Sequence, residues 1–399
     1  MVTSGGMRRF AISTSLLGLF FFTSGAPTPL YSVYASRWDF GSPTLTAAFA
    51  VYAVALLTAL LLFGDLSDAV GRRPVVFGAT ALLLLALVLF ALANGVVWLF
   101  AARLVQGLAV GLLTAAVSAA MLDTEPPDRP RLASLASVLA AMGGQALGVL
   151  VSASLVELAP YPLRLIYVVA IALTVVLAAL FVAGVPETAP QRHRFVPGVR
   201  IGVPAEARDA FLAAAPCLIA TWALSSFYLS LGPSLVGDLT GSDNHVVAVA
   251  GALTLLGAAT VAAALARGLA ARARMLGGCV LLGLGAALTV LSLALTTTPL
   301  FFVSTAIAGL GFGVAFAGAL ETLTALAPQD ARGELVSAVY VVAYLSFSVP
   351  AVIAGIVSTG PGLVDTAIGS SGAVAALALG AALATWRSVW SPRRPHLIG

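Results

Sequence analysis

The chain has few charged residues for its length, and it contains no lysine. Only 9% of its 399 residues are charged, whereas soluble domains carry about 25%. All 20 of its Lys and Arg residues are arginines, and 60% of all residues are hydrophobic. This composition excludes a soluble globular protein and predicts an integral membrane protein. The arginines are expected at the membrane edges, so the net positive charge does not imply a nucleic-acid partner.

Cysteine and histidine are also scarce, which removes several kinds of site. Cys217 and Cys279 both fall in apolar segments, so we expect buried thiols and no disulfide framework. His193, His245 and His396 fall in predicted loops or in the tail, so no intramembrane histidine relay or metal site is predicted. The chain also lacks a P-loop, a G-x-S-x-G elbow and an H-E-x2-H pair. We therefore expect no metal, no other cofactor and no enzyme activity.

Long apolar runs dominate the rest of the chain. A membrane-spanning helix needs about 20 apolar residues. Twelve runs meet this requirement, at residues 10–30, 45–63, 74–93, 96–121, 133–156, 164–185, 210–235, 246–266, 275–296, 300–325, 334–357 and 370–388. The basic start could pass for a signal peptide, but its apolar segment continues without a clear cleavage site, so it is interpreted as the first span. Breaks are predicted at Pro27 and Pro29, at Gly232 and Pro233, and at Pro350.

The longest polar connection divides these runs into two sets of six. It covers residues 186–209 and separates an N-terminal half, 1–185, from a C-terminal half, 210–399. A faint repeat supports the division, because several positions recur at an offset of 202 residues. These are Gly107-x3-Gly111 and Gly309-x3-Gly313, Asp128 and Asp330, and Arg72 and Arg274.

The arginines predict the orientation. If the N-terminus is cytoplasmic, seventeen of the 20 arginines lie on the cytoplasmic side. Arg37 and Arg164 then lie outside, and Arg103 lies within a span. The positive-inside rule therefore predicts that both termini are cytoplasmic.

A charged run with a distinctive spacing lies between the second and third apolar runs. The stretch FGDLSDAVGRRP, from Phe63 to Pro74, has the spacing G-x3-D-x2-G-R-R, formed by Gly64, Asp68, Gly71, Arg72 and Arg73. The glycines allow a tight turn, Asp68 can cap or ion-pair, and the arginines suit the cytoplasmic lipid surface. The run resembles the loop signature between spans 2 and 3 of the major facilitator superfamily, although Ala69 stands where a basic residue is usual. The alternative is a stop-transfer cluster that only sets topology.

This resemblance implies an all-α integral membrane fold of twelve helices in two pseudo-symmetric six-helix halves. It implies secondary active transport of a small organic molecule across a bacterial plasma membrane by alternating access. The loop residues would act in a gate, in which Asp68 holds the halves together near the start of span 11. A proton gradient would supply the energy, the lipid bilayer and the small-molecule substrate would be the partners, and a monomer would suffice.

Arg103 is the strongest single candidate for a functional residue, because it lies about seven residues into the fourth span, where a charge is costly. The stretch ARLVQGLAVG puts Gln106 on the same helical face, where it is a candidate for substrate binding. The R-x2-Q-G pattern resembles the superfamily's span 4 motif, whose arginine is implicated in proton coupling. The alternative is an arginine that snorkels to the outer interface.

Glu321 is the most deeply embedded acid, about five residues from the cytoplasmic end of span 10. An intramembrane carboxylate can carry a proton, so Glu321 is a second candidate for proton coupling. Alternatively, it is a helix-end acid paired with Arg274 or Arg332. It lies about 140° around the helix from Phe316, so the two are not expected to face the same cavity.

Span 5 departs from the pattern of drug:proton antiporters, which often carry G-P-x2-G-G there. The chain keeps Gly144 and Gly148, but Gln145 replaces the proline and Val149 replaces the last glycine. Gln145 could bind substrate or tie helices together. Efflux is expected from the resemblance to drug exporters, and the altered signature favours the alternative of a proton-coupled importer or a facilitator.

Five aromatic residues lie in spans that the superfamily places around its central cavity, so they are candidates for substrate binding. They are Phe21, Trp222, Phe227, Phe312 and Phe316. Each could instead serve packing, and Tyr31 and Tyr34 are expected at the outer interface. No acid lies in the middle of a span in the first half, which favours neutral, amphipathic or weakly anionic cargo. A remote alternative is a polytopic membrane enzyme or sensor.

Overall fold

The computed structural model describes residues 4–126, 132–189, 198–199, 201–326 and 332–390. Asp128, Asp330, His193, His396 and seven of the arginines predicted to be cytoplasmic lie outside this part. Within it every regular element is helical: α1 (Ser4–Gly25), α2 (Leu30–Trp38), α3 (Ser42–Phe63), α4 (Leu66–Val70), α5 (Arg72–Ala91), α6 (Val96–Asp123), α7 (Leu132–Leu158), α8 (Leu165–Gly184), α9 (Ala205–Ser230), α10 (Gly232–Thr240), α11 (His245–Ala248), α12 (Ala250–Leu265), the 3-10 turn η1 (Ala266–Gly268), α13 (Ala271–Ala294), α14 (Thr298–Leu326), α15 (Arg332–Val357) and α16 (Leu363–Trp390).

Twelve stretches in the described part are long and apolar enough to cross a membrane, which confirms the predicted all-α architecture. Two predicted breaks are present, because α1 ends before Pro27 and α9 ends before Gly232. The predicted break at Pro350 is wrong: this proline lies inside α15, as Pro216 lies inside α9. Membrane helices tolerate such prolines when surrounding groups satisfy the freed carbonyl.

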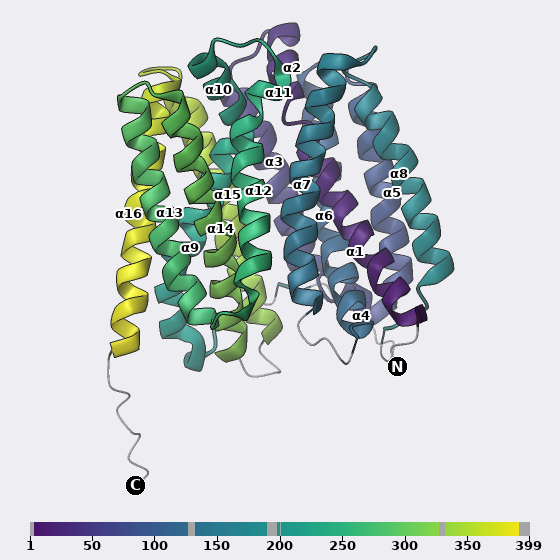
Figure 1. The fold of residues 1–399 in the computed structure, drawn as a ribbon. Helices are drawn as coiled ribbons and strands as arrows, with labels where there is room; N and C mark the ends of the chain where they lie inside the picture. The colour runs from purple at the N-terminus through teal and green to yellow at the C-terminus, as the bar shows by residue number, and fades with distance from the viewer. Residues whose placement is uncertain (1–3, 127–131, 190–197, 200, 327–331, 391–399) are drawn as a thin grey trace.

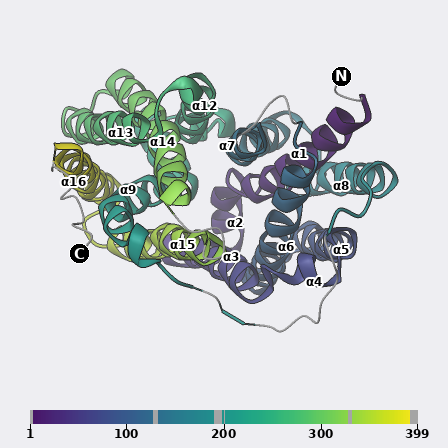
Figure 2. The same ribbon diagram turned by 90° about the horizontal axis from the view of Figure 1, so that it is seen from below.

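The helices form two groups that stand side by side. Figure 1 shows α9–α16 beside α1–α8, and Figure 2 shows the same two groups from below. We call the end with α4, the start of α1 and the end of α16 the lower end. The end with α2, α10 and α11 is the upper end. Across the boundary, α3 packs on α15 and α7 packs on α12.

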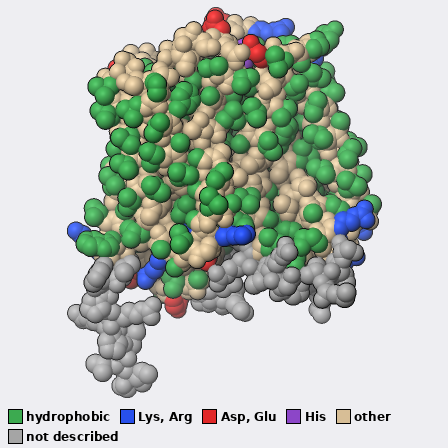
Figure 3. Space-filling model, viewed as in Figure 1, with side chains coloured by type: hydrophobic (Ala, Val, Ile, Leu, Met, Phe, Trp, Pro, Cys, Tyr) green, Lys and Arg blue, Asp and Glu red, His purple; other side chains and the backbone are tan. Residues whose placement is uncertain are grey.

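The surface between the two ends is apolar. Figure 3 shows hydrophobic side chains over the middle of one face, with basic and acidic side chains at the upper and lower ends. Exposed hydrophobic residues include Phe77, Val97 and Val168, which would be unfavourable in water. This distribution is the one expected for a protein surrounded by lipid tails.

The repeat seen in the sequence corresponds to a repeated packing contact. In the first half, a Cβ added at Gly111 of α6 would lie 2.5 Å from the Leu56 carbonyl oxygen of α3. In the second half, a Cβ added at Gly313 of α14, the position equivalent to Gly111, would overlap the Ala259 carbonyl oxygen of α12. Small residues let membrane helices approach this closely. The two halves therefore use the same glycine contact to seat one helix on another.

We predict that Gly111→Ala lowers stability by about 1–3 kcal/mol, the usual cost of forcing a methyl group into a packed interface. Thermal unfolding of the purified protein in detergent measures the change. Gly78→Ala is the matched control, because a Cβ there meets nothing within 4 Å. Equal melting temperatures for the two variants would contradict this packing argument.

Candidate functional site

A cavity of about 80 Å³ lies between the two groups of helices. We call it the central cavity. Residues from seven helices line it: Phe21, Tyr52, Val138, Ala141, Met142, Gln145, Trp222, Ser225, Leu256, Phe312, Phe316, Tyr344 and Phe347. Five of the seven predicted substrate-binding residues are among them. No motif in the sequence points to Tyr52, Tyr344 and Phe347, since neither their spacing nor their type distinguishes them from packing aromatics.

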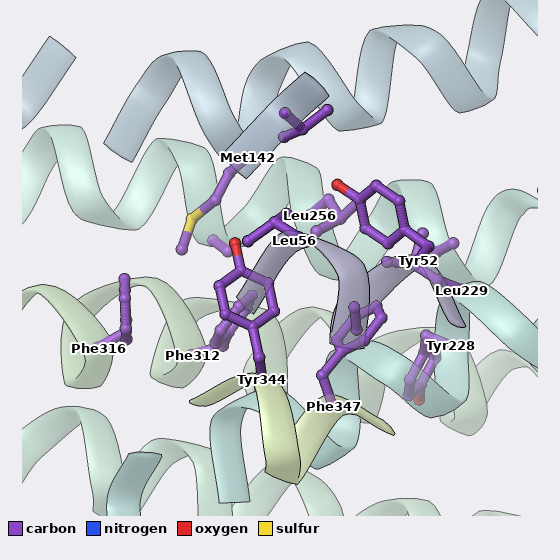
Figure 4. Close-up of a cluster of buried hydrophobic side chains, with 14 of the residues drawn as sticks. Tyr52, Leu56, Met142, Tyr228, Leu229, Leu256, Phe312, Phe316, Tyr344 and Phe347 are labelled. Carbon is purple, nitrogen blue, oxygen red and sulfur yellow. The ribbon is translucent and has the colours of Figure 1, made fainter. Parts of the chain in front are cut away.

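Aromatic rings form most of the cavity wall. Trp222 meets Phe316, Tyr344 and Phe347 edge-on, with ring centroids 5.6, 4.9 and 6.1 Å apart. Figure 4 shows Phe312 and Phe316 of α14 near Tyr344 of α15 and Met142 of α7. Edge-to-face rings pack stably while leaving ring faces available for contact with a guest.

The cavity has hydrogen-bonding groups but no charged side chain among its described lining residues. The indole Nε1 of Trp222 is buried and has no hydrogen-bond partner in the described part of the chain. A buried N–H without a partner is unfavourable and calls for an explanation, such as a ligand that supplies an acceptor. Gln145 and Ser225 add further polar atoms to the wall.

Two predicted substrate-binding residues lie elsewhere. Phe227 lines a separate groove of about 370 Å³ between α9, α15 and α16, with Pro350 and Asp365. It follows Trp222 by five positions, which turns it about 140° around α9 and away from the central cavity. Gln106 is fully buried and bonds to Arg103 and to the Thr23 carbonyl.

Arg103 is fully buried, which argues against the snorkelling alternative. Its Nε donates to the Tyr31 hydroxyl, and its Nη1 donates to Gln106 Oε1 at 2.7 Å and to the Ser24 carbonyl at 3.3 Å. Four rings lie within 5.2–5.7 Å of the guanidinium carbon, namely Tyr31, Phe49, Tyr52 and Phe90. No described carboxylate pairs with it, and its Nη2 has no described partner.

The break between α1 and α2 supplies the acceptors for this arginine. Proline has no N–H, so Pro27 cannot close a helical bond to the Thr23 carbonyl. Gln106 Nε2 donates to that carbonyl instead, at 2.8 Å. The Thr28 N–H bonds to Gly25, which leaves the Ser24 carbonyl for Arg103. The proline that ends α1 thus exposes the carbonyls that the Arg103–Gln106 pair satisfies.

Tyr52 connects this arginine to the central cavity. Its ring lines the cavity, and its centroid lies 5.3 Å from the Arg103 guanidinium carbon. Its hydroxyl donates to Ser24 Oγ at 2.9 Å, on the residue whose carbonyl accepts from Arg103. A change in the position of Tyr52 would therefore affect both the cavity and the arginine.

Glu321 lies below the central cavity and is paired with Arg274. Both line a smaller space of about 70 Å³, which we call the lower vestibule, together with Arg267 and Val138. Val138 also lines the central cavity, so the two spaces are neighbours. Phe316 faces the cavity and Glu321 faces the vestibule, as the helical angle between them predicts.

The loop from Gly64 to Arg73 forms a charge network at the lower end. Arg72 pairs with Asp68 at 2.5 Å and with Asp123 at 3.4 Å, and it donates to Ser67 at 2.7 Å. Gly71 has φ 113°, a conformation that favours glycine, and it starts α5. These contacts of Asp68 and Arg72 tie α4, α5 and α6 of the first half together.

The remaining loop residues also contact the first half. Arg73 donates to the Val182 carbonyl of α8, and a Cβ at Gly64 would lie 2.7 Å from the Leu60 carbonyl oxygen. The side chain of Arg332, at the start of α15, lies outside the described part. The role of Asp68 in holding the two halves together therefore stays a prediction.

Glu187, which follows α8, caps the start of α5. Its carboxylate accepts the backbone N–H groups of Arg72 at 2.8 Å and Arg73 at 3.1 Å. Burial works to raise the pKa of Glu187, but these N–H groups together with that of Ala189 hold the pKa below its ordinary value. A carboxylate at a helix N-terminus also interacts favourably with the helix dipole.

The halves also meet at the upper end. Glu157, near the end of α7, accepts from the backbone N–H of His245 and lies 3.1 Å from its Nδ1. At the boundary between α3 and α15, Gly355 of α15 lies against the Thr46 side chain of α3.

Tyr31 and Tyr34, expected at the outer interface, are instead fully buried. They are buried because Tyr31 bonds to Arg103 and Tyr34 bonds to Tyr167 at 3.1 Å.

We predict that Glu187→Gln lowers stability at neutral pH by about 0.5–1 kcal/mol, since a neutral amide interacts more weakly with the helix N-terminus. A lowered folded-state pKa contributes stability above the unfolded pKa, which is lost as the pH falls through the folded pKa. The wild type should therefore lose more melting temperature than the variant between about pH 6 and pH 3. Asp209→Asn, at an exposed site beyond the first turn of α9, is the control. Parallel pH profiles would contradict the capping role.

Comparisons with known proteins agree with this architecture. A sequence model of the Major Facilitator Superfamily matches residues 13–351. No curated protein matches the chain by sequence.

Among solved structures, a bacterial homologue of the human lysosomal transporter Spinster, in an inward-facing and unoccupied conformation, superposes with TM-score 0.78. The two are 14% identical, and the alignment covers 98% of this chain and 100% of that one. The human organic anion transporter MFSD10 (TETRAN) gives TM-score 0.70 and 15% identity, over 95% of this chain and 99% of that one. The peptide transporter POT in complex with sulfate gives 0.75 and 16%, over 96% and 94%. At such low identities, the solved structures show only that the fold is shared. The family model, which matches most of the chain, shows membership of the family. The chain belongs to the major facilitator superfamily, and it is a multi-pass membrane protein and a secondary transporter rather than an enzyme.

Proposed function

We propose that this protein exports a small aromatic compound, uncharged or weakly anionic, across a bacterial plasma membrane in exchange for protons. The central cavity carries the proposal, because both halves contribute to its wall. A site shared by two halves is what alternating access requires, since each half can move around bound cargo. In this reading both termini are cytoplasmic and the protein works as a monomer.

The chemistry of the cavity wall supports this class of cargo. Seven of its 13 lining residues are aromatic, and no charged side chain is among them. Trp222 and Gln145 offer hydrogen-bond donors, which suit an acceptor oxygen on the cargo. A fixed positive charge lies directly behind the wall, because the Arg103 guanidinium carbon is 5.3 Å from the ring centroid of Tyr52. A cation would therefore be repelled from a cavity that holds no acid to compensate it.

The contacts between the halves are consistent with an inward-facing state. Glu157 and His245 join the halves at the upper end, and the Thr46–Gly355 contact joins α3 to α15. The lower vestibule adjoins the central cavity on the opposite side. Cargo would enter from the cytoplasm by this vestibule and leave after the upper contacts separate.

Arg103 and Glu321 would divide the work of proton coupling. An arginine stays charged at every accessible pH, so Arg103 cannot carry the proton itself. It would instead set the potential that cargo meets in the cavity. Glu321 is an acid on the vestibule wall, and its protonation would weaken its pairing with Arg274. The loop residues Gly64, Asp68, Gly71, Arg72 and Arg73 would stabilise one of the two conformations.

A proton-coupled importer or a facilitator of a metabolite is the second candidate. It is favoured by the substitutions in span 5, where Gln145 and Val149 depart from the antiporter signature. Gln145 lines the central cavity, and Val149 is fully buried in α7. The direction of flux separates this candidate from export.

Three probe molecules test the proposed class of cargo. Acetophenone, cumene and trimethylphenylammonium share a similar shape but are respectively a neutral acceptor, an apolar molecule and a cation. We expect acetophenone to bind most tightly to the purified protein in nanodiscs, measured by equilibrium dialysis with empty nanodiscs subtracted. Trp222→Phe should weaken acetophenone binding about threefold to tenfold, the value of one hydrogen bond, and leave cumene unchanged. Trp386→Phe, at a half-exposed site, is the control. Tightest binding of the cation would contradict the proposed cargo.

Everted membrane vesicles that hold a proton gradient test the proton coupling and the direction of transport. Addition of acetophenone should collapse the gradient with wild-type protein. Glu321→Gln should respond weakly and lose the pH dependence of transport, because its amide does not titrate. Asp68→Asn should reduce turnover while the protein remains inserted. Uptake into right-side-out vesicles, with no response in everted ones, would favour the importer. An unaltered pH dependence in Glu321→Gln would remove its proton-carrier role.

A further inference from the structure

A second pocket, of about 470 Å³, opens at the upper end of the first half. We call it the upper pocket. Its wall contains Arg37 of α2 and Arg164, which precedes α8. Among the arginines in the described part, only these two lie at the upper end, where basic residues are expected to be rare. Two rare charges in a single pocket indicate a site with a function.

Neither guanidinium has a partner within the described chain. No described acid forms an ion pair with Arg37 or Arg164, and no described group accepts a hydrogen bond from either side chain. Asp39 follows α2 nearby but does not line the pocket. Each arginine therefore keeps its five donors for a ligand, and planar guanidinium groups bind the oxygens of phosphate in pairs.

The rest of the protein adds to the positive potential and fixes one of the arginines. Phe90, on the pocket wall, lies 5.7 Å from the buried Arg103 guanidinium carbon. Tyr161 has φ 58°, an uncommon conformation for a residue with a side chain. Its carbonyl accepts the Arg164 N–H at 3.0 Å, so this strained turn positions Arg164 at the pocket.

The location of the pocket favours a lipid over a soluble anion. The pocket contains Ala91 at the end of α5 and lies just before the start of α8, at Leu165. These are the ends of two spans, the depth at which lipid headgroups lie. Val33, Phe90 and Leu163 give the pocket apolar walls, and Leu92 and Val168 are exposed beside it. Phosphate binding beside an apolar wall matches the junction of a headgroup with its acyl chains.

We propose that the upper pocket binds the phosphate of an anionic phospholipid from the upper leaflet, with Arg37 and Arg164 as its ligands. The bound lipid joins α2 to the turn before α8. Since α2 also supplies Tyr31 to Arg103, lipid occupancy stabilises the segment that holds the buried charge.

Native mass spectrometry of the full chain released from detergent tests the proposal. The probes are phosphatidylglycerol, phosphatidylcholine with the same acyl chains, and soluble glycerol 1-phosphate. We expect one tightly held phosphatidylglycerol, and an affinity about tenfold or more lower in Arg37→Gln/Arg164→Gln, given roughly 1 kcal/mol for each arginine near an anionic surface. Arg208→Gln/Arg387→Gln is the matched control, because it removes the same charge from exposed sites at the lower end and should bind like wild type.

Three results would overturn the proposal. One is equal retention of phosphatidylglycerol by both double variants. Another is equal binding of phosphatidylcholine by wild type. The third is displacement of phosphatidylglycerol by glycerol 1-phosphate at comparable concentration, which would identify a soluble-anion site instead of a lipid site. The single variants Arg37→Gln and Arg164→Gln, with matching melting temperatures, separate loss of binding from loss of folding.

Discussion

A buried positive charge with no described acidic partner is the constraint around which the first half is built. Bringing Arg103 into the membrane is costly, so its donors must be satisfied by neighbouring groups. The Pro27 break leaves the Thr23 and Ser24 carbonyls available, and Gln106 and Arg103 donate to them. Tyr31, just beyond the break, accepts a further hydrogen bond. The broken first span and the charged fourth span therefore satisfy each other's polar groups.

The second half repeats the framework without repeating the charge. The position 202 residues after Arg103 is Thr305, whose hydroxyl bonds to Tyr228 of α9 at 2.7 Å. The glycine contact of α6 on α3 recurs as α14 on α12. The close helix packing, which any lipid-embedded bundle needs, is therefore present in both halves. The arginine is present in the first half only.

The sequence was sufficient to predict what depends on local composition. Apolar runs of sufficient length gave the twelve spans, and charged spacing gave the loop signature. The predicted helix boundaries were wrong where polar ends extend a helix beyond its apolar run, as at Ala205 and Leu363. The predicted break at Pro350 was wrong because tertiary packing keeps α15 intact. The cavity was harder to predict because it depends on rotation of each helix. Trp222 and Phe227 are five residues apart on one helix, yet they line different spaces. Tyr52 has no motif around it, and only the fold brings it between the cavity and Arg103.

If transport is coupled to protons, as proposed, the vertical order of charges offers a way for a neutral cavity to respond to them. Arg103 lies above the cavity and stays charged, whereas Glu321 and Arg274 lie below it on the vestibule wall. Cargo in the central cavity would touch no charged side chain among its described lining residues, so it would not compete directly for a proton there. It can move Tyr52, which contacts both the cavity and the Ser24–Arg103 group. In the proposed mechanism, protonation would act at the lower end and cargo near the middle, and movement of a half as one body would join the two events.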